Sequence, residues 1–235
     1  AEADPTADVD GFDAARKIAI LSSIAYNGFV DFEDVKCIGI RNVIYADHEL
    51  AATGGFAIKL IAGSKITEKG VRISVEPKLV SKSSMLAAVN SVYNAVLVRG
   101  SYTGDSLFYG QGAGKLATAS AILGDIIEIL EAPERQNLPA FVDKAANIVK
   151  DSQEKERFYV RVKAEFKDTE SEELKSCINS VFGDNAVYLG YALSDNSTAA
   201  FITDYCSESE FNNKCEELAN CNYVEAVTYT MRVAE

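Results

Sequence analysis

Residues 158–166 read FYVRVKAEF, a run rich in β-branched and aromatic side chains that predicts a β-strand. Local patterns of the same clarity continue to residue 233, and they predict in order a strand at 158–166, a helix at 171–182, strands at 186–193 and 199–205, a helix at 208–219 and a strand at 223–233. This βαββαβ order is typical of a ferredoxin-like unit, an antiparallel sheet with two helices on one face. We therefore expect such a module over residues 157–235, with Asp195-Asn196 as the turn between its middle strands.

The part of the chain before this module has a mixed pattern. Short strands are predicted at 56–62, 71–75 and 95–98, and a helix at 117–130. Two prolines at 133 and 139 and an almost wholly polar stretch at 150–156 then interrupt the pattern. The fold class is α+β, with a mixed-sheet domain at 1–132, a linker with a helical segment at 133–156, and the ferredoxin-like module at 157–235.

Composition narrows the possible classes of function. The chain has 235 residues, 48% of them hydrophobic, and a net charge of -12. Such acidity opposes binding to nucleic acid or to an anionic membrane surface. No apolar run is as long as a membrane span, and the N-terminus does not resemble a signal peptide, so we expect a cytoplasmic protein.

The cysteines and the single histidine give little sign of a catalytic or metal site. The five cysteines are odd in number and contain no Cys-x-x-Cys pair, which argues against a disulfide framework and against zinc. Those of the C-terminal module are interpreted as small buried residues or free thiols, with a redox role as the lesser alternative: Cys177, Cys206, Cys215 and Cys221. His48 is expected to be an ordinary helix or surface residue.

The N-terminus concentrates charge. Residues 2–17, EADPTADVDGFDAARK, contain five carboxylates and one lysine. A calcium loop is rejected, because Thr6 would occupy its first ligand position and Lys17 its last. We expect Asp10 to cap a helix in which Asp13 and Lys17, four residues apart, share a face. On residue patterns alone, the favoured interpretation of this pair is an exposed ion pair worth ~0.3 to 0.5 kcal/mol, because acid–lysine pairs at this spacing are common.

The glycines at 110, 112 and 114 suggest a close approach of the backbone to a ligand, since a helix follows them. Their spacing departs from the Rossmann fingerprint. A tight turn that packs a helix against a sheet explains them equally well.

Four stretches together carry a resemblance to a known family: EADPTADVDGFDAARK at 2–17, GGFAIKLIA at 54–62, NAV at 94–96 and YGQGAGKLATASA at 109–121. In order and spacing they resemble homoserine dehydrogenase. The match covers residues 1 to about 130.

The resemblance implies NAD(P)-dependent interconversion of L-homoserine and L-aspartate 4-semialdehyde, in threonine and methionine biosynthesis. By the same carry-over, Lys17 transfers the proton of the substrate hydroxyl and Asp13 positions Lys17. Glu2 binds the α-ammonium group and Asp8 lines the substrate pocket. An alcohol oxidation needs a proton acceptor, and an amino-acid substrate needs carboxylate partners, so these residue types suit the chemistry.

The resemblance also implies that Gly112, Gly114 and Thr118 form one wall of the NADP or NAD site. The family's nucleotide-binding domain precedes the acidic motif. We therefore expect this chain to lack that domain, together with a second catalytic lysine and a monovalent-cation site, and to be inactive alone. No metal ligands are assigned within the chain.

The βαββαβ module resembles an ACT domain, which implies threonine or another amino acid as effector, and the family implies a homodimer. The loop at 167–172, KDTESE, lacks the small-residue turn that usually meets the ligand in such modules. A purely dimerising role is therefore kept open. The alternative for the whole chain is a non-catalytic module that binds amino acids and dimerises.

Overall fold

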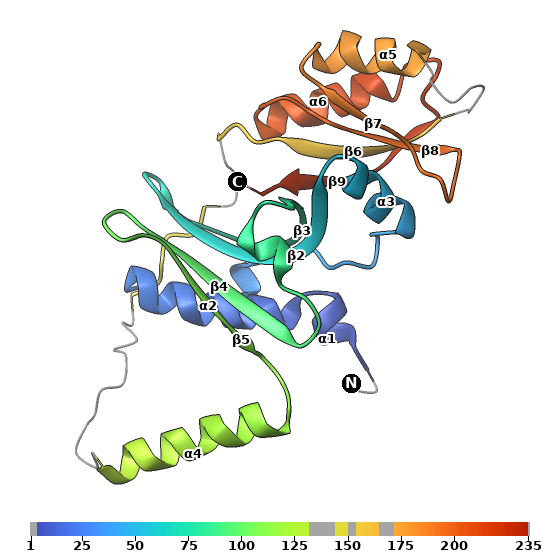
Figure 1. Cartoon of the computed structure of the whole chain (residues 1–235). Helices are drawn as coiled ribbons and strands as arrows, with labels where there is room; N and C mark the ends of the chain where they lie inside the picture. The colour runs from blue at the N-terminus through green and yellow to red at the C-terminus, as the bar shows by residue number, and fades with distance from the viewer. Residues whose placement is uncertain (1–3, 132–143, 150–153, 165–171, 235) are drawn as a thin grey trace. The chain divides into compact units, whose positions relative to one another are not determined.

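The computed structural model describes residues 4–131, 144–149, 154–164 and 172–234 (Figure 1). The chain forms two compact units, one of residues 1–81 with 141–235 and one of residues 82–140. The second unit is therefore inserted in the sequence of the first. In the described part of the chain, no helix is long and apolar enough to span a membrane.

The larger unit contains a seven-stranded mixed sheet in which β2 pairs with β3 and the other strands follow the order β1-β3-β9-β6-β8-β7. The strands are β1 (Lys36–Cys37), β2 (Phe56–Thr67), β3 (Gly70–Ser81), β6 (Phe158–Lys163), β7 (Val187–Tyr191), β8 (Thr198–Ile202) and β9 (Ala226–Val233). β2 pairs antiparallel with the whole length of β3, while β1 and β9 pair in parallel with successive parts of the other edge of β3. One sheet thus joins the N-terminal part to the C-terminal module.

The C-terminal module has the βαββαβ order that the sequence predicts. Its helices α5 (Glu172–Phe182) and α6 (Glu208–Leu218) pack on one face of β6–β9 around a core of apolar side chains that includes Phe158, Leu174 and Phe201. The Asp195 carboxylate fixes the turn between β7 and β8. It accepts hydrogen bonds from the backbone N–H of Ser197 and from the hydroxyls of Ser197 and Thr198. The predicted ferredoxin-like fold is confirmed.

The other face of this sheet is covered by α3 (Tyr45–Thr53), a helix that the sequence patterns did not predict. Leu50 and Ala51 of α3 pack with Tyr159 and Ile202 of the sheet in a second core. Figure 1 shows α3 across the strands from α5 and α6. The module is therefore a three-layer structure whose third layer comes from residues more than a hundred positions earlier.

Three helices precede these elements: α1 (Thr6–Val9), α2 (Phe12–Tyr26) and the short 3₁₀ helix η1 (Phe32–Asp34). α2 packs on the sheet through Ala15 and Ala19, beside Val75 of β3. The expected helix cap at Asp10 is wrong: the residue before α2 is Gly11, at φ +82°. A Cβ there would lie 2.9 Å from Val75, so a glycine lets the corner between α1 and α2 sit directly on β3.

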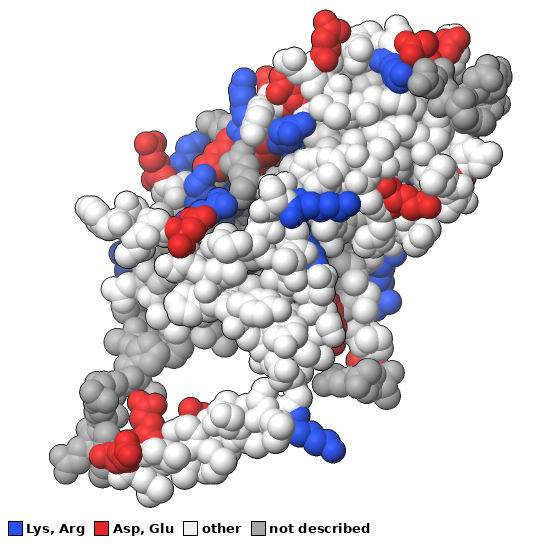
Figure 2. Space-filling model, in the orientation of Figure 1, with Lys and Arg blue, Asp and Glu red and all other residues white. Residues whose placement is uncertain are grey.

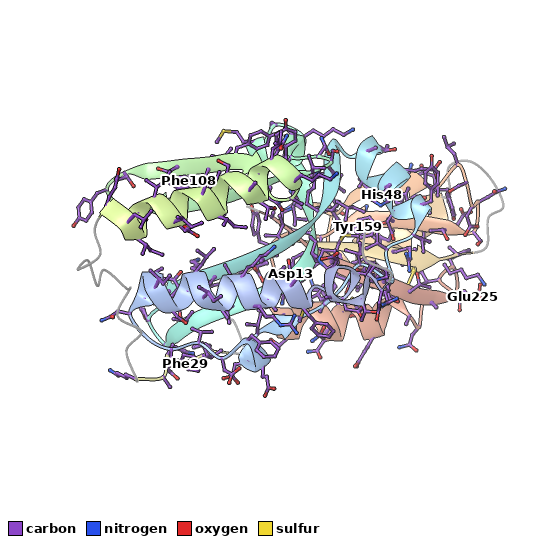
Figure 3. The ribbon with its side chains drawn as sticks, turned by 90° about the horizontal axis from the view of Figure 1, so that it is seen from below. Asp13, Phe29, His48, Phe108, Tyr159 and Glu225 are labelled. Carbon is purple, nitrogen blue, oxygen red and sulfur yellow. A yellow bond between two sulfur atoms is a disulfide. The ribbon has the colours of Figure 1, made fainter. Side chains whose placement is uncertain are left out.

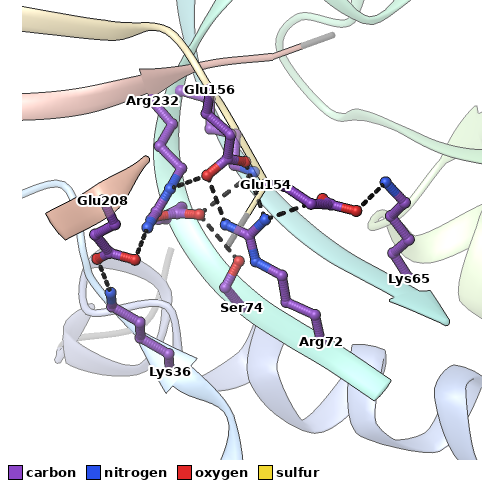
Figure 4. Close-up of polar contacts among 10 residues, drawn as sticks. Lys36, Lys65, Arg72, Ser74, Glu154, Glu156, Glu208 and Arg232 are labelled. Carbon is purple, nitrogen blue, oxygen red and sulfur yellow. Dashed lines mark hydrogen bonds and ion pairs between the residues drawn. The ribbon is translucent and has the colours of Figure 1, made fainter. Parts of the chain in front are cut away.

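Charged side chains fill the junction between β3 and β9 (Figure 4). The Arg232 guanidinium of β9 contacts Glu76 of β3 at 2.5 Å, and Glu156 and Glu208 at 2.8 Å each. Arg72 of β3 makes two hydrogen bonds to the same Glu156 carboxylate. Arg232 is only 6% exposed, so this network lies within the fold.

The cysteine prediction needs correction. Cys177 of α5 and Cys221, which follows α6, form a disulfide across 44 positions. Cys37, Cys206 and Cys215 are free. The bond joins two segments that only the tertiary fold brings together, so no local spacing in the sequence marks it.

The predicted linker lies mostly outside the described residues. Its described part includes 144–149, which runs extended and bridges to Phe29 and Val71 through Ala145 and Ile148. The loop at 167–172 also falls outside the described residues, apart from Glu172 at the start of α5. The domain boundaries at 132 and 157 remain a prediction.

The smaller unit contains the 3₁₀ helix η2 (Met85–Ala88), the antiparallel hairpin β4 (Tyr93–Gly100) and β5 (Gly104–Gln111), and the helix α4 (Lys115–Glu131). The described side chains of α4 include large apolar residues that are more than half exposed, such as Leu116, Ile122 and Ile129. Figure 2 shows a mostly uncharged surface along this helix.

Candidate active site

The corner between α1 and α2 arranges the acidic residues of the N-terminus. The Asp4 carboxylate accepts hydrogen bonds from the backbone and the hydroxyl of Thr6, at 3.0 and 2.6 Å, and these bonds lower the pKa of Asp4. Asp8 lies exposed on α1. Glu2, the residue assigned to the substrate ammonium, lies outside the described residues.

Asp13 and Lys17 form the expected pair on α2. The Lys17 Nζ lies 2.6 Å from the Asp13 Oδ2, one helical turn away. The Lys17 and Asp13 side chains are 68% and 45% exposed, whereas Ala15 and Ala19 of the same helix are buried. An amine held beside a carboxylate at the surface can meet a ligand without any rearrangement of the core.

The loop after β1 packs against the corner between α1 and α2. The Ile40 N–H donates to the Val9 carbonyl at 2.9 Å, and the Arg41 guanidinium pairs with the Asp10 carboxylate at 2.5 Å. A Cβ at Gly39 would clash with the backbone of Val9 and Asp10, so the loop lies directly against the corner. The sequence patterns missed Arg41, and the one signal for this contact is the glycine between two isoleucines at 38–40.

The corner is also closed on the side of β1. The Cys37 thiol donates to the Asp10 carbonyl at 3.1 Å. Burial, followed by the negative charge of Asp10, raises the pKa of Cys37. The thiol is thus a structural donor rather than a nucleophile.

Gly112, Gly114 and Thr118 lie together in the smaller unit, at the start of α4. The Gly112 N–H donates to the Val92 carbonyl, and the Thr118 N–H donates to the Gly114 carbonyl at 3.0 Å. Gly114 has φ +126°, and no heavy atom lies within 4 Å of the position that a Cβ would take there. The backbone before α4 is therefore open to a ligand, at a helix end whose first N–H groups favour anions.

His48 has no part in the corner. It lies exposed on α3, as expected of an ordinary helix residue (Figure 3). The chemical groups that the corner offers thus include one amine, Lys17, which is paired with the Asp13 carboxylate, and the exposed carboxylate of Asp8 on α1. Such a set can bind an ammonium group and move a proton at a hydroxyl.

Comparisons with known proteins indicate the family of the chain. The family model described as homoserine dehydrogenase matches residues 1–127. Homoserine dehydrogenase of Synechocystis sp. is 49% identical over 134 residues, which are 55% of this chain and 31% of that protein. The Bacillus subtilis homoserine dehydrogenase is 31% identical over 245 residues, covering 99% of this chain and 55% of the relative.

Solved structures extend the likeness to the whole chain. A homoserine dehydrogenase from Thiobacillus denitrificans matches with a TM-score of 0.80 at 29% identity, over 100% of this chain and 56% of that chain. The S. aureus homoserine dehydrogenase at pH 7.0 matches with a TM-score of 0.76 at 33% identity, with the same coverage. The chain spans about half the length of these structures and of the Bacillus relative.

Proposed function

Because the chain belongs to the homoserine dehydrogenase family, we propose that it carries the substrate-binding and proton-transferring part of an NAD(P)-dependent enzyme that interconverts L-homoserine and L-aspartate 4-semialdehyde. The observation that carries the proposal is the exposed pair of Lys17 and Asp13 at 2.6 Å on α2. The enzyme would serve threonine and methionine biosynthesis in the cytoplasm.

Lys17 is the proton-transferring group of the proposal. In the oxidation, the substrate hydroxyl gives its proton to the neutral Lys17 amine while its carbon loses a hydride. In the reduction, the Lys17 ammonium returns the proton to the oxygen of the aldehyde. Asp13 holds Lys17 on the exposed face of α2, so that Nζ keeps one position through both directions.

Glu2 would bind the substrate's α-ammonium group, and Asp8 would line the substrate pocket. Asp8 is exposed on α1 and close in sequence to the Gly11 corner, so its carboxylate can accept charge-assisted hydrogen bonds from an ammonium. Each such bond is worth about 1.5 to 3 kcal/mol. Their combination with Lys17 would select an amino alcohol over a simple alcohol.

The cofactor site would include Gly112, Gly114 and Thr118. The open backbone at Gly114 and the adjacent end of α4 fit a phosphate group of NADP or NAD. A nicotinamide cofactor held by these residues would supply the hydride chemistry, as acceptor in the oxidation and donor in the reduction. We propose that the rest of the cofactor site, and hence turnover, requires the part of a full-length dehydrogenase that these 235 residues do not span.

The C-terminal module would act as an ACT regulatory domain. Its confirmed βαββαβ order supports a site for an amino-acid effector such as threonine, and the family supports a homodimer. Both are parts of the proposal.

Calorimetry with L-homoserine tests the proposed substrate site. We expect the chain to bind homoserine and Asp8→Asn to weaken the affinity by about 10- to 100-fold, from the loss of a charge-assisted hydrogen bond. Arg16→Ala is the control, because Arg16 is a charged residue of the neighbouring helix α2, has no role in the proposal and contacts only the Phe32 ring among the interactions described for it. A folded chain that does not bind homoserine, or an Asp8→Asn variant with unchanged affinity, would contradict the site.

A further inference from the structure

One loop of the larger unit touches both the candidate active site and the C-terminal module. On the first side, the Ile40 N–H donates to Val9, and Arg41 pairs with Asp10. On the second side, the Asn42 carbonyl accepts a hydrogen bond from Nη1 of Arg161, on β6, at 3.3 Å. Arg41 and Asn42 are adjacent in the chain, so a single peptide link connects the two sets of contacts.

Arg161 also fixes the end of this loop through Asp47. The Asp47 carboxylate is fully buried and lies 2.6 Å from Arg161 Nη1. Its oxygens also accept from the Tyr159 hydroxyl at 2.7 Å and from the Ile44 N–H at 2.9 Å. Ile44 is the residue at which the loop ends and α3 begins, so Asp47 ties that point to the sheet.

The guanidinium has little freedom of its own. Its Nε donates to the Thr228 hydroxyl at 3.0 Å, and it lies over the Tyr229 ring at 5.1 Å. Both of these residues are on β9, the strand beside β6. The relative position of β6 and β9 therefore determines where Arg161 holds the loop.

We propose that Arg161 is a positioning residue for the substrate site, acting from the C-terminal module through the loop at 38–44. This inference rests on the proposed function of Asp8, Asp13 and Lys17. The loop would fix the position of the corner between α1 and α2 relative to β3. It would thereby also fix the positions of the Asp8 and Asp13 carboxylates. A ligand or partner that shifts β6 against β9 would then alter homoserine affinity without touching the site.

The test compares two basic residues of the same strand. Arg161→Met removes the contacts to Asn42 of the loop and to Asp47 of α3, whereas Lys163→Met removes an exposed ion pair with Glu225. Because Arg161→Met leaves Asp47 buried without its cation, Asp47→Asn/Arg161→Met is made as well; the oxygen of the new amide can accept from the Ile44 N–H, and its NH2 group can donate to the Tyr159 hydroxyl oxygen. Arg161→Lys, which keeps the charge but has one donor group for two partners, is the mildest variant.

Two readouts on the folded chain separate positioning from general destabilisation. The first is hydrogen exchange at the Ile40 amide, which we expect to accelerate by about tenfold in the Arg161 variants and to stay within about twofold in Lys163→Met. The second is homoserine affinity, which we expect to fall by about fivefold or more. In an Arg41→Ala background the loss caused by Arg161→Lys should shrink, because the link to Asp10 is already cut.

Unchanged exchange at Ile40 in the folded double variant would overturn the inference, as would fully additive effects of Arg41→Ala and Arg161→Lys on affinity. Failure of the wild-type chain to bind homoserine would instead overturn the proposed function. The exchange experiment needs no substrate, so it decides the positioning role in either case.

Discussion

Helices α2 and α3 each carry an aspartate paired with a cation, but in opposite surroundings. Asp13 of α2 meets Lys17 in solvent, with side chains 45% and 68% exposed. Asp47 of α3 meets Arg161 with no exposure of the carboxylate. An exposed pair is weak and free to exchange its partner for a substrate, whereas a buried pair cannot lose one member without leaving a charge unsolvated. The contrast separates groups suited to chemistry from groups suited to holding a geometry.

The largest effect expected is on turnover at the exposed pair. With the complementary nucleotide-binding part supplied, Lys17→Ala should lower kcat by about 10²- to 10⁴-fold, the usual contribution of a positioned proton-transfer group. The same substitution should change the free energy of unfolding by less than about 0.5 kcal/mol, because the pair of Lys17 and Asp13 is exposed. Steady-state kinetics and urea denaturation measure the two quantities. Undiminished turnover would remove Lys17 from the mechanism.

The buried pair of Asp47 and Arg161 should instead have a large effect on the free energy of unfolding. Asp47→Ala is expected to lower the free energy of unfolding by about 3 to 5 kcal/mol, since Arg161 is then left buried without its anion. Glu225→Ala, which removes the exposed partner of Lys163 on the same sheet, should change it by less than about 1 kcal/mol. Urea denaturation measures both free energies of unfolding. Equal losses in the two variants would contradict the expected difference between buried and exposed pairs.

A third test measures how the buried charged network around Arg232 makes the free energy of unfolding depend on pH. Burial raises the pKa of Glu76, but Lys78 and Arg232 lower it by more, so the net pKa lies below its ordinary value of 4.5. The pKa of Glu156 is likewise lowered, against its burial, by Arg72 and Arg232. A depressed pKa stabilises the fold above pH 4.5, and that stabilisation is lost as pH falls through the lower value of the folded state.

Unfolding free energies should therefore decrease from pH 6 to pH 3.5, and less steeply in Glu76→Gln than in the wild-type chain. Glu225→Gln serves as the exposed control and should keep the wild-type slope. A Glu76→Gln variant with an unchanged slope would show that this network does not govern the acid sensitivity.

The smallest effect is expected for Asp13→Asn. The substitution should change the free energy of unfolding by less than about 0.5 kcal/mol, because it removes one exposed i,i+4 pair. A loss above about 1.5 kcal/mol would mean that Asp13 supports the fold, which would place it with Asp47 in the comparison.

What the sequence predicted well is local. The periodicity of the C-terminal module and the spacing of Asp13 and Lys17 depend on residues within one turn or one strand, and the structure confirms both. The helix α3 was missed because a buried Asp47 breaks its apolar pattern, and the cation that explains it lies 114 positions away. The contact between Arg41 and Asp10 and the disulfide between Cys177 and Cys221 were missed for the same reason.

The two corrections have a common physical cause. Asp10 has the residue type of a helix cap, but contact with β3 requires a glycine at the cap position and leaves the Asp10 carboxylate to Arg41. Cysteine spacing is informative for local motifs, whereas the observed disulfide joins two separate segments. In both cases tertiary contacts determined the outcome.

The parallel pairing of β9 with β3 has a consequence for how the chain folds during synthesis. Lys78 and Arg232 are register partners, yet 153 residues emerge from the ribosome between them. The edge of β3 that receives β9 stays unpaired there until residue 233 has been made, while residues 82–140 can already collapse as a separate unit. Contacts of such long sequence separation slow folding and leave strand edges open to wrong partners. The nascent chain is thus most exposed to aggregation in the interval before its last strand arrives.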